Sequence, residues 1–277
     1  MIIEAPSPFS FKDGELLEMQ QTVNNVNVNY SDLSLIDAAV ISTLDLLLVS
    51  TGELLVKHIM DRGYPASPES VSASLERLTS LNVIKKGVIR SQDHAFMLTV
   101  FFLDEQGKTF LAKAGRIPYQ PWVITELDIT RIKRLLCVQQ FATAMRLDYR
   151  APEYCIYNSD YGFLPLKADL IRRSARQFDI VEGVRREHNW MNVLHDRLDK
   201  IETFLEKEHL TSLLRVTLVC ERKAHQDEVF EFLDHENIPY HFRIRLSNDN
   251  ALADGDLMLS DWYQGCLMAT IRRRNRS

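Results

Sequence analysis

Apolar positions recur every three or four residues from residue 34 to about residue 80. This spacing predicts three amphipathic helices in succession. Ser34, Thr51 and Ser67 stand at the expected N-caps, where a hydroxyl can accept a free backbone N–H. Pro68 follows at a first helical position, and Gly63 suits the end of the second helix. The first half of the chain is therefore expected to begin with a three-helix group.

The pattern then changes to the alternation that is typical of strands. Two strands are expected over 83–90 and 95–103, joined by the turn SQDH, and a short amphipathic helix follows over 106–114. Residues 1–33 have the character of an arm, in which the alternation VNNVNVNY over 23–30 indicates an edge strand. A hairpin with an added edge strand is the expected sheet of this half.

A boundary is expected near residues 117–127, which hold two prolines and little periodicity. Asp128 then caps a helix that runs to about Arg146. Beyond Pro152 short strand patterns alternate with helical ones, and 214–221 is apolar enough for a strand buried on both faces. We expect strands over 153–157, 164–171, 177–184, 214–221 and 240–246, and helices over 190–205 and 226–234.

Composition limits the classes of protein that fit these elements. The 277 residues suffice for two modest domains, and 45% hydrophobic with 26% charged residues is ordinary for a globular protein. No apolar run approaches the ~20 residues of a membrane span, and the first residues lack the pattern of a secretory signal. The cysteines form no CxxC pair, which argues against structural zinc and for a reducing cytoplasm. They are Cys137, Cys155, Cys220 and Cys266.

The net charge of −5 does not indicate nucleic-acid binding, so any such activity has to come from local basic patches. The candidates are a cluster over 131–134, the basic stretch 167–186 and a tail over 272–276. Each patch is as consistent with a solvated face as with a phosphate contact.

The stretch KADLIRRSARQFDIVEGVRR, at 167–186, joins two short apolar strands through a basic turn. Asp169 belongs to the first strand and Glu182 to the second. Two carboxylates on neighbouring strands are typical ligands of a divalent cation such as Mg²⁺, and basic surroundings suit a phosphate backbone. The pair indicates a nuclease, or a protein that keeps the shape of one.

Three helices followed by a hairpin are the order of the winged helix-turn-helix family. The stretch LERLTSLNVIKKGVIRSQDHAFMLTVFFLDEQGKTFL resembles that family, whose hairpin ends in a leucine-rich strand and xxGxxxL. Because the third helix of that family reads base edges in the major groove, the resemblance implies DNA contacts by the helix and hairpin. Two glutamates on the exposed helix face repel phosphate, and winged helices also serve as docking modules. The implied contacts are Ser72, Arg77, Lys85, Lys86 and Arg90.

The second half, with Asp169 and Glu182 where they stand, resembles the PD-(D/E)XK nuclease fold. In that fold an Asp on one strand and a Glu two residues before a Lys on the next bind Mg²⁺ around the scissile phosphate. Val184 holds the lysine position here and can neither donate a proton nor balance charge. Lys167 and Arg185 are the residues that could substitute for the lysine. Asp169 and Glu182 are thus catalytic and metal-binding candidates only if the site is active.

A winged helix, a bridging helix and a degenerate nuclease core, in that order, resemble the replication-relaxation family of plasmids and integrative conjugative elements. The matching motifs are LLCVQQFA at 135–142, LPLKADLI at 164–171 and FDIVEGVRR at 178–186. The resemblance spans about residues 34–235. It implies a DNA-associated role in plasmid replication, DNA relaxation or mobilisation, or in their control.

We therefore expect a mixed α/β (α+β) fold in four parts. An arm (1–33) precedes a winged helix-turn-helix domain (34–117), a linker with a bridging helix (118–150) and a nuclease-like mixed-sheet α/β domain with a basic tail (151–277). Further DNA contacts are expected in the bridging helix and the nuclease-like domain. These are Arg131, Lys133, Arg134, Arg172, Arg173, Arg185 and Arg186.

The predicted function is DNA binding by a cytoplasmic mobile-element protein with an inactive nuclease-like domain and no cofactor. One alternative is an active nuclease that uses Mg²⁺, Asp169 and Glu182, which a lysine close to Glu182 would favour. Another is a transcriptional regulator whose C-terminal domain senses a ligand or mediates dimerisation, which a closed apolar pocket there would favour. DNA is the expected partner, together with replication or mobilisation proteins of the element. A homodimer is expected, and no membrane association.

Overall fold

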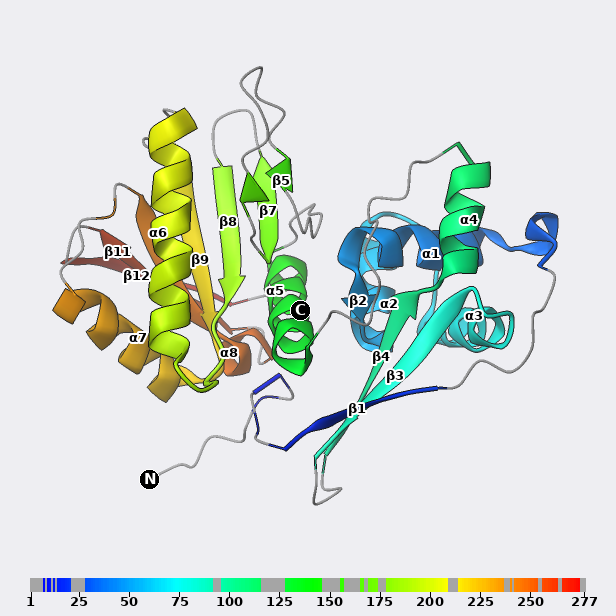
Figure 1. Ribbon diagram of the computed structural model, residues 1–277, viewed down its shortest axis with the longest axis horizontal. Helices are drawn as coiled ribbons and strands as arrows, with labels where there is room; N and C mark the ends of the chain where they lie inside the picture. Colours follow the sequence, from blue (N-terminus) through cyan, green and yellow to red (C-terminus); the bar gives the residue numbers. More distant parts are fainter. Residues whose placement is uncertain are drawn as a thin grey trace. The chain divides into compact units, whose positions relative to one another are not determined.

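The computed structural model is a mixed α/β protein that divides into two compact units (Figure 1). Unit 1 consists of Met1–Phe11 together with Gln140–Ser277, and unit 2 of Lys12–Gln139. The division falls inside a helix, whereas the boundary expected over 117–127 lies outside the described residues. The structure describes residues 7, 9, 10, 12, 14–20, 28–91, 96–115, 128–145, 155, 156, 165, 166, 169–173, 178–208, 214–236, 240, 242–253, 256–263 and 266–274.

The first three helices of unit 2 begin where their capping side chains predict. Ser34 accepts a hydrogen bond from the N–H of Asp37, whose carboxylate in turn accepts the N–H of Ser34. The Thr51 side chain caps the second helix, and Ser67 caps the third, with Pro68 at its first position. The predicted order and caps are confirmed. The helices of this region are α1 Leu35–Leu47, α2 Gly52–Asp61, α3 Pro68–Ser80 and α4 Glu105–Lys113.

The expected hairpin is confirmed and forms the middle of a four-stranded antiparallel sheet with the order β1-β3-β4-β2. The arm does supply an edge strand, at Leu16–Met19, whereas residues 23–27 of the alternating stretch expected to form it lie outside the described residues. Tyr30–Asp32 form a short 3-10 helix, and the Asn29 side chain accepts bonds from the N–H and hydroxyl of Ser31. Asparagine side chains compete with strand pairing in this way. The strands are β1 Leu16–Met19, β2 Val49–Ser50, β3 Ile84–Arg90 and β4 Met97–Leu103.

Helix α5 (Ile129–Ala144) is tied to the sheet of unit 2 through its middle. Asp128 caps it as predicted, accepting the N–H of Arg131 at 2.6 Å. The buried Gln139 side chain donates to the carbonyl of Val49 at 2.6 Å and accepts the Ser50 hydroxyl at 2.9 Å. The bridging helix of the sequence prediction is therefore anchored on β2 of unit 2.

A six-stranded mixed sheet with the order β12-β11-β10-β9-β8-β7 forms the centre of unit 1 (Figure 1). Strands β8, β9 and β10 are parallel neighbours, connected by α6 and α7, while β7 and the β11–β12 hairpin pair antiparallel. The elements are β5 Cys155–Ile156, β6 Pro165–Leu166, β7 Leu170–Arg173, β8 Phe178–Gly183, α6 Trp190–Glu208, β9 Leu214–Cys220, α7 Lys223–Glu236, β10 Arg243–Asn248, α8 Asp249–Ala253, β11 Asp256–Tyr263 and β12 Cys266–Arg274.

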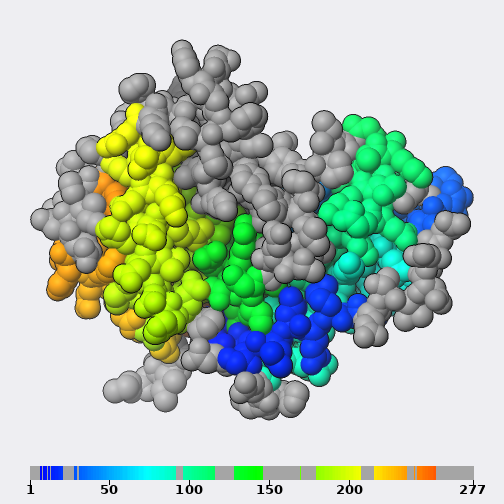
Figure 2. Space-filling model, viewed as in Figure 1, coloured from blue at the N-terminus to red at the C-terminus, as the bar shows by residue number. Residues whose placement is uncertain are grey.

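Both α6 and α7 pack on one face of this sheet. Alternate residues of the parallel strands, such as Ile180, Val216 and Ile244, join apolar side chains of both helices in a single core cluster. Successive right-handed crossovers in one direction place their helices on the same side, which accounts for this layer. The outer face of α6 is visible in yellow in Figure 2. The side chains of Ile180 and Glu182, on the opposite face of β8 from Val181, consequently lie beneath α6.

Two features of unit 1 differ from the sequence prediction. The stretch 164–171 is not one strand: β6 ends at Leu166, and Asp169 lies immediately before β7. The β11–β12 hairpin was missed, because its last three residues are arginines and suggested a solvated tail. Backbone pairing with the preceding strand, which side-chain polarity does not report, makes this segment a strand.

Candidate functional site

The structure brings Asp169 and Glu182 together, as predicted. Leu170 pairs with Val181 across β7 and β8, so the residues just outside this pair stand opposite each other. The backbone N–H of Gly183 donates to Asp169 Oδ2 at 2.9 Å, and the N–H of Asp169 lies 3.4 Å from Glu182 Oε1. Asp169 is 4% exposed and Glu182 1%. Two buried carboxylates this close need a positive charge.

Arg197 of α6 supplies that charge. Its Nη1 donates to Asp169 Oδ2 at 3.2 Å and its Nη2 to Asp169 Oδ1 at 3.1 Å, a two-pronged contact. The same Nη2 also forms an ion pair with Glu182 Oε2. Burial alone lowers the pKa of Arg197, but the carboxylates of Asp169 and Glu182 outweigh it and raise that pKa above its usual value. The guanidinium therefore stays charged between the two carboxylates.

The spacing of α6 in the sequence marks Arg197 as a residue of its buried face. Leu194, Leu198 and Ile201 form the buried stripe of α6, and all three are in the core cluster. Arg197 lies three residues after Leu194 and four before Ile201, so it occupies the same stripe. A charged residue on an apolar stripe has to find a buried partner of opposite charge. The partner's identity becomes visible only in the folded sheet.

The position next to Glu182 carries no cationic group from its own strand. Val184 packs in the core cluster with Ile180, as the alternation of β8 predicts. Arg185 contacts the carbonyls of Phe9 and Val219 and the carboxylate of Asp249 instead. Lys167, the other candidate substitute, lies outside the described residues.

The carboxylate pair does not fit a divalent cation as it stands. Asp169 presents both of its oxygens to Arg197, and Glu182 presents one. A hard cation needs several oxygen ligands with free lone pairs. In the part of the chain that the structure describes, no group of three or more His, Cys, Asp or Glu side chains converges. The guanidinium takes the place that a metal ion would need.

The DNA contacts predicted for α3 and the hairpin are only partly available. Ser72 is exposed on α3. Arg77 instead pairs with the buried Asp37 of α1, and Lys85 pairs with Asp104 at 3.0 Å. Lys86 and Arg90 share one face of β3, where Arg90 is 3.2 Å from Glu18 of β1. The side chain of Arg90 is half-buried and that of Glu18 is exposed. An ion pair between such side chains is weak and exchangeable.

Lys133 was wrongly expected to contact DNA. Its side chain is 0% exposed, and Nζ lies 2.7 and 2.5 Å from the two carboxylate oxygens of Glu15. The same Nζ lies 5.6 Å from the centre of the Phe96 ring. Lys133 therefore lies on the inner face of α5 and forms its ion pair within unit 2. Its neighbours Arg131 and Arg134 are half-buried.

Arg185 is the second wrong expectation. It is 1% exposed and forms a buried ion pair with Asp249 at 2.5 Å. The next residue, Arg186, is half-buried and pairs with Glu228 of α7. Arg172 and Arg173 belong to β7, and the structure describes their backbone only. Arg185 and Arg186 thus have different environments although they are adjacent in sequence, because their side chains lie on opposite faces of the chain.

Unit 2 contains a groove of about 840 Å³ between α2, α3 and the sheet. It was not predicted, since it forms where elements separate in sequence face one another. Its lining is more apolar than polar. Side chains that line it include Val56, Leu75, Phe101, Ser72, Glu76 and Lys86.

The chain matches no family model, and neither a curated protein nor a solved structure is detectably similar to it. Among the described residues, no helix has the length and apolar character needed to cross a bilayer.

Proposed function

We propose that this protein binds DNA without cleaving it, through a winged helix in unit 2 and a nuclease-like PD-(D/E)XK domain in unit 1. The proposed setting is plasmid-type replication, DNA relaxation or mobilisation of the replication-relaxation kind. DNA of the mobile element is the proposed partner. The observation that carries the proposal is the Arg197 contact with Asp169 and Glu182.

The order of elements in unit 2 supports the winged helix. Helices α1, α2 and α3 precede the β3–β4 hairpin, and β2, between α1 and α2, joins β4 at the sheet edge. A winged helix has this succession, in which the third helix and the hairpin face the duplex. Helix α3 and β3 of this chain line a common groove, which gives that face a concave shape.

The strand order of unit 1 supports the proposal of a nuclease-like domain that lacks groups needed for cleavage. Its antiparallel β7–β8 pair leads through α6 to the parallel β9, and the two carboxylates lie at the start of β7 and near the end of β8. Cleavage of a phosphodiester requires a group that activates water and one that balances the developing charge. Arg197 engages both carboxylates, and Val184 stands in the lysine position.

The side chains proposed to contact DNA are those on the groove face of unit 2. Lys86 and Ser72 line the groove, and Arg90 is on the same face of β3 as Lys86. Lysine and arginine on this face can neutralise phosphates, which supplies affinity without sequence preference. Glu76, which also lines the groove, limits how closely a phosphate backbone can approach α3.

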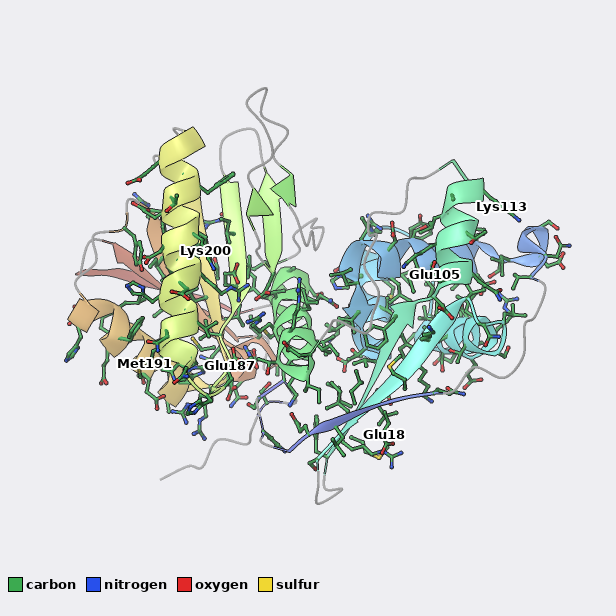
Figure 3. The ribbon with its side chains drawn as sticks, viewed as in Figure 1. Glu18, Glu105, Lys113, Glu187, Met191 and Lys200 are labelled. Atoms are coloured by element: carbon green, nitrogen blue, oxygen red, sulfur yellow. The ribbon has the colours of Figure 1, made fainter. Side chains whose placement is uncertain are left out.

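The test measures binding of a labelled duplex by fluorescence anisotropy over a range of salt concentrations. We expect the double variant Lys86→Ala, Arg90→Ala to bind about tenfold or more weakly, with a log–log salt slope shallower by about 1.8, at ~0.9 per phosphate contact. The matched control is Lys113→Ala, Lys200→Ala, which removes the same charge from exposed positions at the end of α4 and in the middle of α6 (Figure 3).

The same samples, incubated with Mg²⁺ or Mn²⁺, are expected to leave linear and supercoiled DNA intact. Equal losses in the two double variants would remove the groove face from the interface. Metal-dependent nicking that disappears in Asp169→Ala would contradict the absence of cleavage and support the active nuclease.

A further inference from the structure

One face of the unit 2 sheet combines cations with apolar side chains. Lys86 of β3 pairs with Phe101 of β4. Arg90 of β3 pairs with Met97 of β4 on one side and with Leu16 of β1 on the other. Cross-strand partners project from the same face of a sheet, and so do residues an even number of positions apart on one strand. These five side chains therefore share one face, which we call the outer sheet face.

The apolar side chains of the outer sheet face are accessible to solvent. Leu16 is 62% exposed and Met97 is 59% exposed, and the half-buried Phe101 lines the groove of unit 2. The opposite face of the same strands is buried, with Ile89 and Val100 at 0% exposure. An apolar patch that the fold leaves accessible is typical of a binding surface. The sheet thus uses one apolar face for its core and keeps a second available for a ligand.

The cations and the acidic side chains of the groove come from different elements. Lys86 lines it from β3, whereas Glu76 lines it from α3 and Glu53, which pairs with Lys57, from α2. A phosphate backbone is attracted to β3 and repelled by Glu76. A duplex that held α3 in its major groove would bring a backbone to both sides of that helix. A single strand has one backbone, which can follow β3 and leave Glu76 without a phosphate beside it.

The lining of the groove suits bases better than phosphates. It is more apolar than polar and includes Val56, Leu75 and the ring of Phe101. Proteins that bind single strands combine aromatic rings, on which bases stack, with cations along the backbone. Because Phe101 is the cross-strand partner of Lys86, a phosphate held by Lys86 has its base within reach of the ring.

We propose that the outer sheet face and the groove bind a single-stranded segment of DNA in preference to a duplex. The backbone follows β3, where Lys86 and Arg90 neutralise phosphates, and an unpaired base stacks on Phe101. Glu18 of β1 forms an ion pair with Arg90 at 3.2 Å and competes with phosphate for it (Figure 3). This inference rests on the proposed DNA binding and names the form of DNA that the site takes.

The test compares a labelled oligothymidine with a duplex of the same length by fluorescence anisotropy, using the full chain. We expect the single strand to bind more tightly. Phe101→Leu keeps the apolar bulk but removes the flat ring, and should weaken single-strand binding by roughly 5- to 100-fold, the range of one base–aromatic stack. The salt slope should not change, since no charge is altered. Phe230→Leu, at a half-buried phenylalanine of α7, is the matched control.

Two further measurements keep the proposal testable if Phe101→Leu folds poorly. An oligothymidine that carries 5-iododeoxyuridine should crosslink to Phe101 of the unaltered chain on irradiation. Glu18→Gln should tighten single-strand binding by up to about five-fold, because it removes an exposed ion-pair partner from Arg90. Glu206→Gln, which removes the same charge from an exposed position on α6, is its control.

The outcomes separate this inference from the function on which it rests. Single-strand binding no tighter than duplex binding, or crosslinks only at other residues, would overturn the inference. Duplex binding that still depends on Lys86 and Arg90 would then leave the proposed function standing. Equal affinities in Glu18→Gln and Glu206→Gln would overturn the role of Arg90, and binding of neither form of DNA would overturn both proposals.

Discussion

At the scale of single residues, one guanidinium decides what the carboxylate pair can do. Arginine suits this place because its planar fork matches both oxygens of Asp169 while a second edge reaches Glu182. A buried charge with partners contributes little net stability, but a partner that is removed leaves the others uncompensated. The two carboxylates are therefore held by Arg197 and depend on it.

We expect Arg197→Ala to lower the free energy of unfolding of unit 1 by about 3–5 kcal/mol, the usual loss when a buried pair is broken. Arg186→Ala is the control, because it removes a half-exposed arginine from an ion pair with Glu228 and should cost about 1 kcal/mol or less. Urea unfolding followed by circular dichroism measures both. Equal losses in the two variants would contradict a special role for Arg197.

At the scale of elements, α4 shows how closely a helix can approach a strand. Gly107 is buried in the first turn of α4, and a Cβ there would come within 2.6 Å of the Val83 carbonyl and still nearer to the Leu103 side chain. The glycine of the xxGxxxL pattern is thus explained by packing of α4 on the hairpin strands. Leu111, at the end of that pattern, is buried on the same helix.

Gly107→Ala is expected to destabilise unit 2 by about 1–3 kcal/mol, the usual cost of overpacking, although alanine is intrinsically the better helix former. Gly52→Ala is the matched control, since its Cβ would meet Leu75 at an ordinary 3.6 Å. That change should be neutral or stabilising by up to about 1 kcal/mol. Thermal unfolding compares the two, and a Gly107→Ala protein as stable as Gly52→Ala would contradict the close approach.

At the scale of the whole molecule, each unit carries a buried histidine that stays neutral. Burial lowers the pKa of His58 in α2 to about 3, and neighbouring cations add to the shift. Burial lowers the pKa of His225 in α7 to about 3 in the same way, and its Nδ1 accepts the N–H of Glu221 at 3.3 Å. Protonation of either ring opposes folding.

Stability is therefore expected to fall as the pH is lowered from about 6.5 toward 3. In this window the unfolded histidine takes up a proton near its ordinary pKa of 6.5, while the folded one does not until about 3. Above this window both states are neutral, so the full stability is present. Urea unfolding at several pH values should give a weaker pH dependence in His58→Gln and His225→Gln than in the unaltered chain. An undiminished slope in both buried variants would contradict neutral histidines.

Local pattern was sufficient to predict most of the elements. Capping residues at Ser34, Thr51 and Ser67 located three helices, because a cap acts on the N–H groups of the next turn only. Alternation located the β3–β4 hairpin. At the end of the alternating stretch Tyr30 begins a short 3-10 helix, and the Asn29 side chain accepts the N–H of Ser31.

The sequence by itself determined that Asp169 and Glu182 would meet, because a short turn joins the strands that carry them. Only the tertiary structure decided their partner, since Arg197 comes from a helix that packs across the sheet. Tertiary structure also buried Lys133 against Glu15, 118 residues away in sequence. Local spacing specifies which face a charge occupies, whereas the packing of distant elements decides whether that face meets solvent, DNA or another charge.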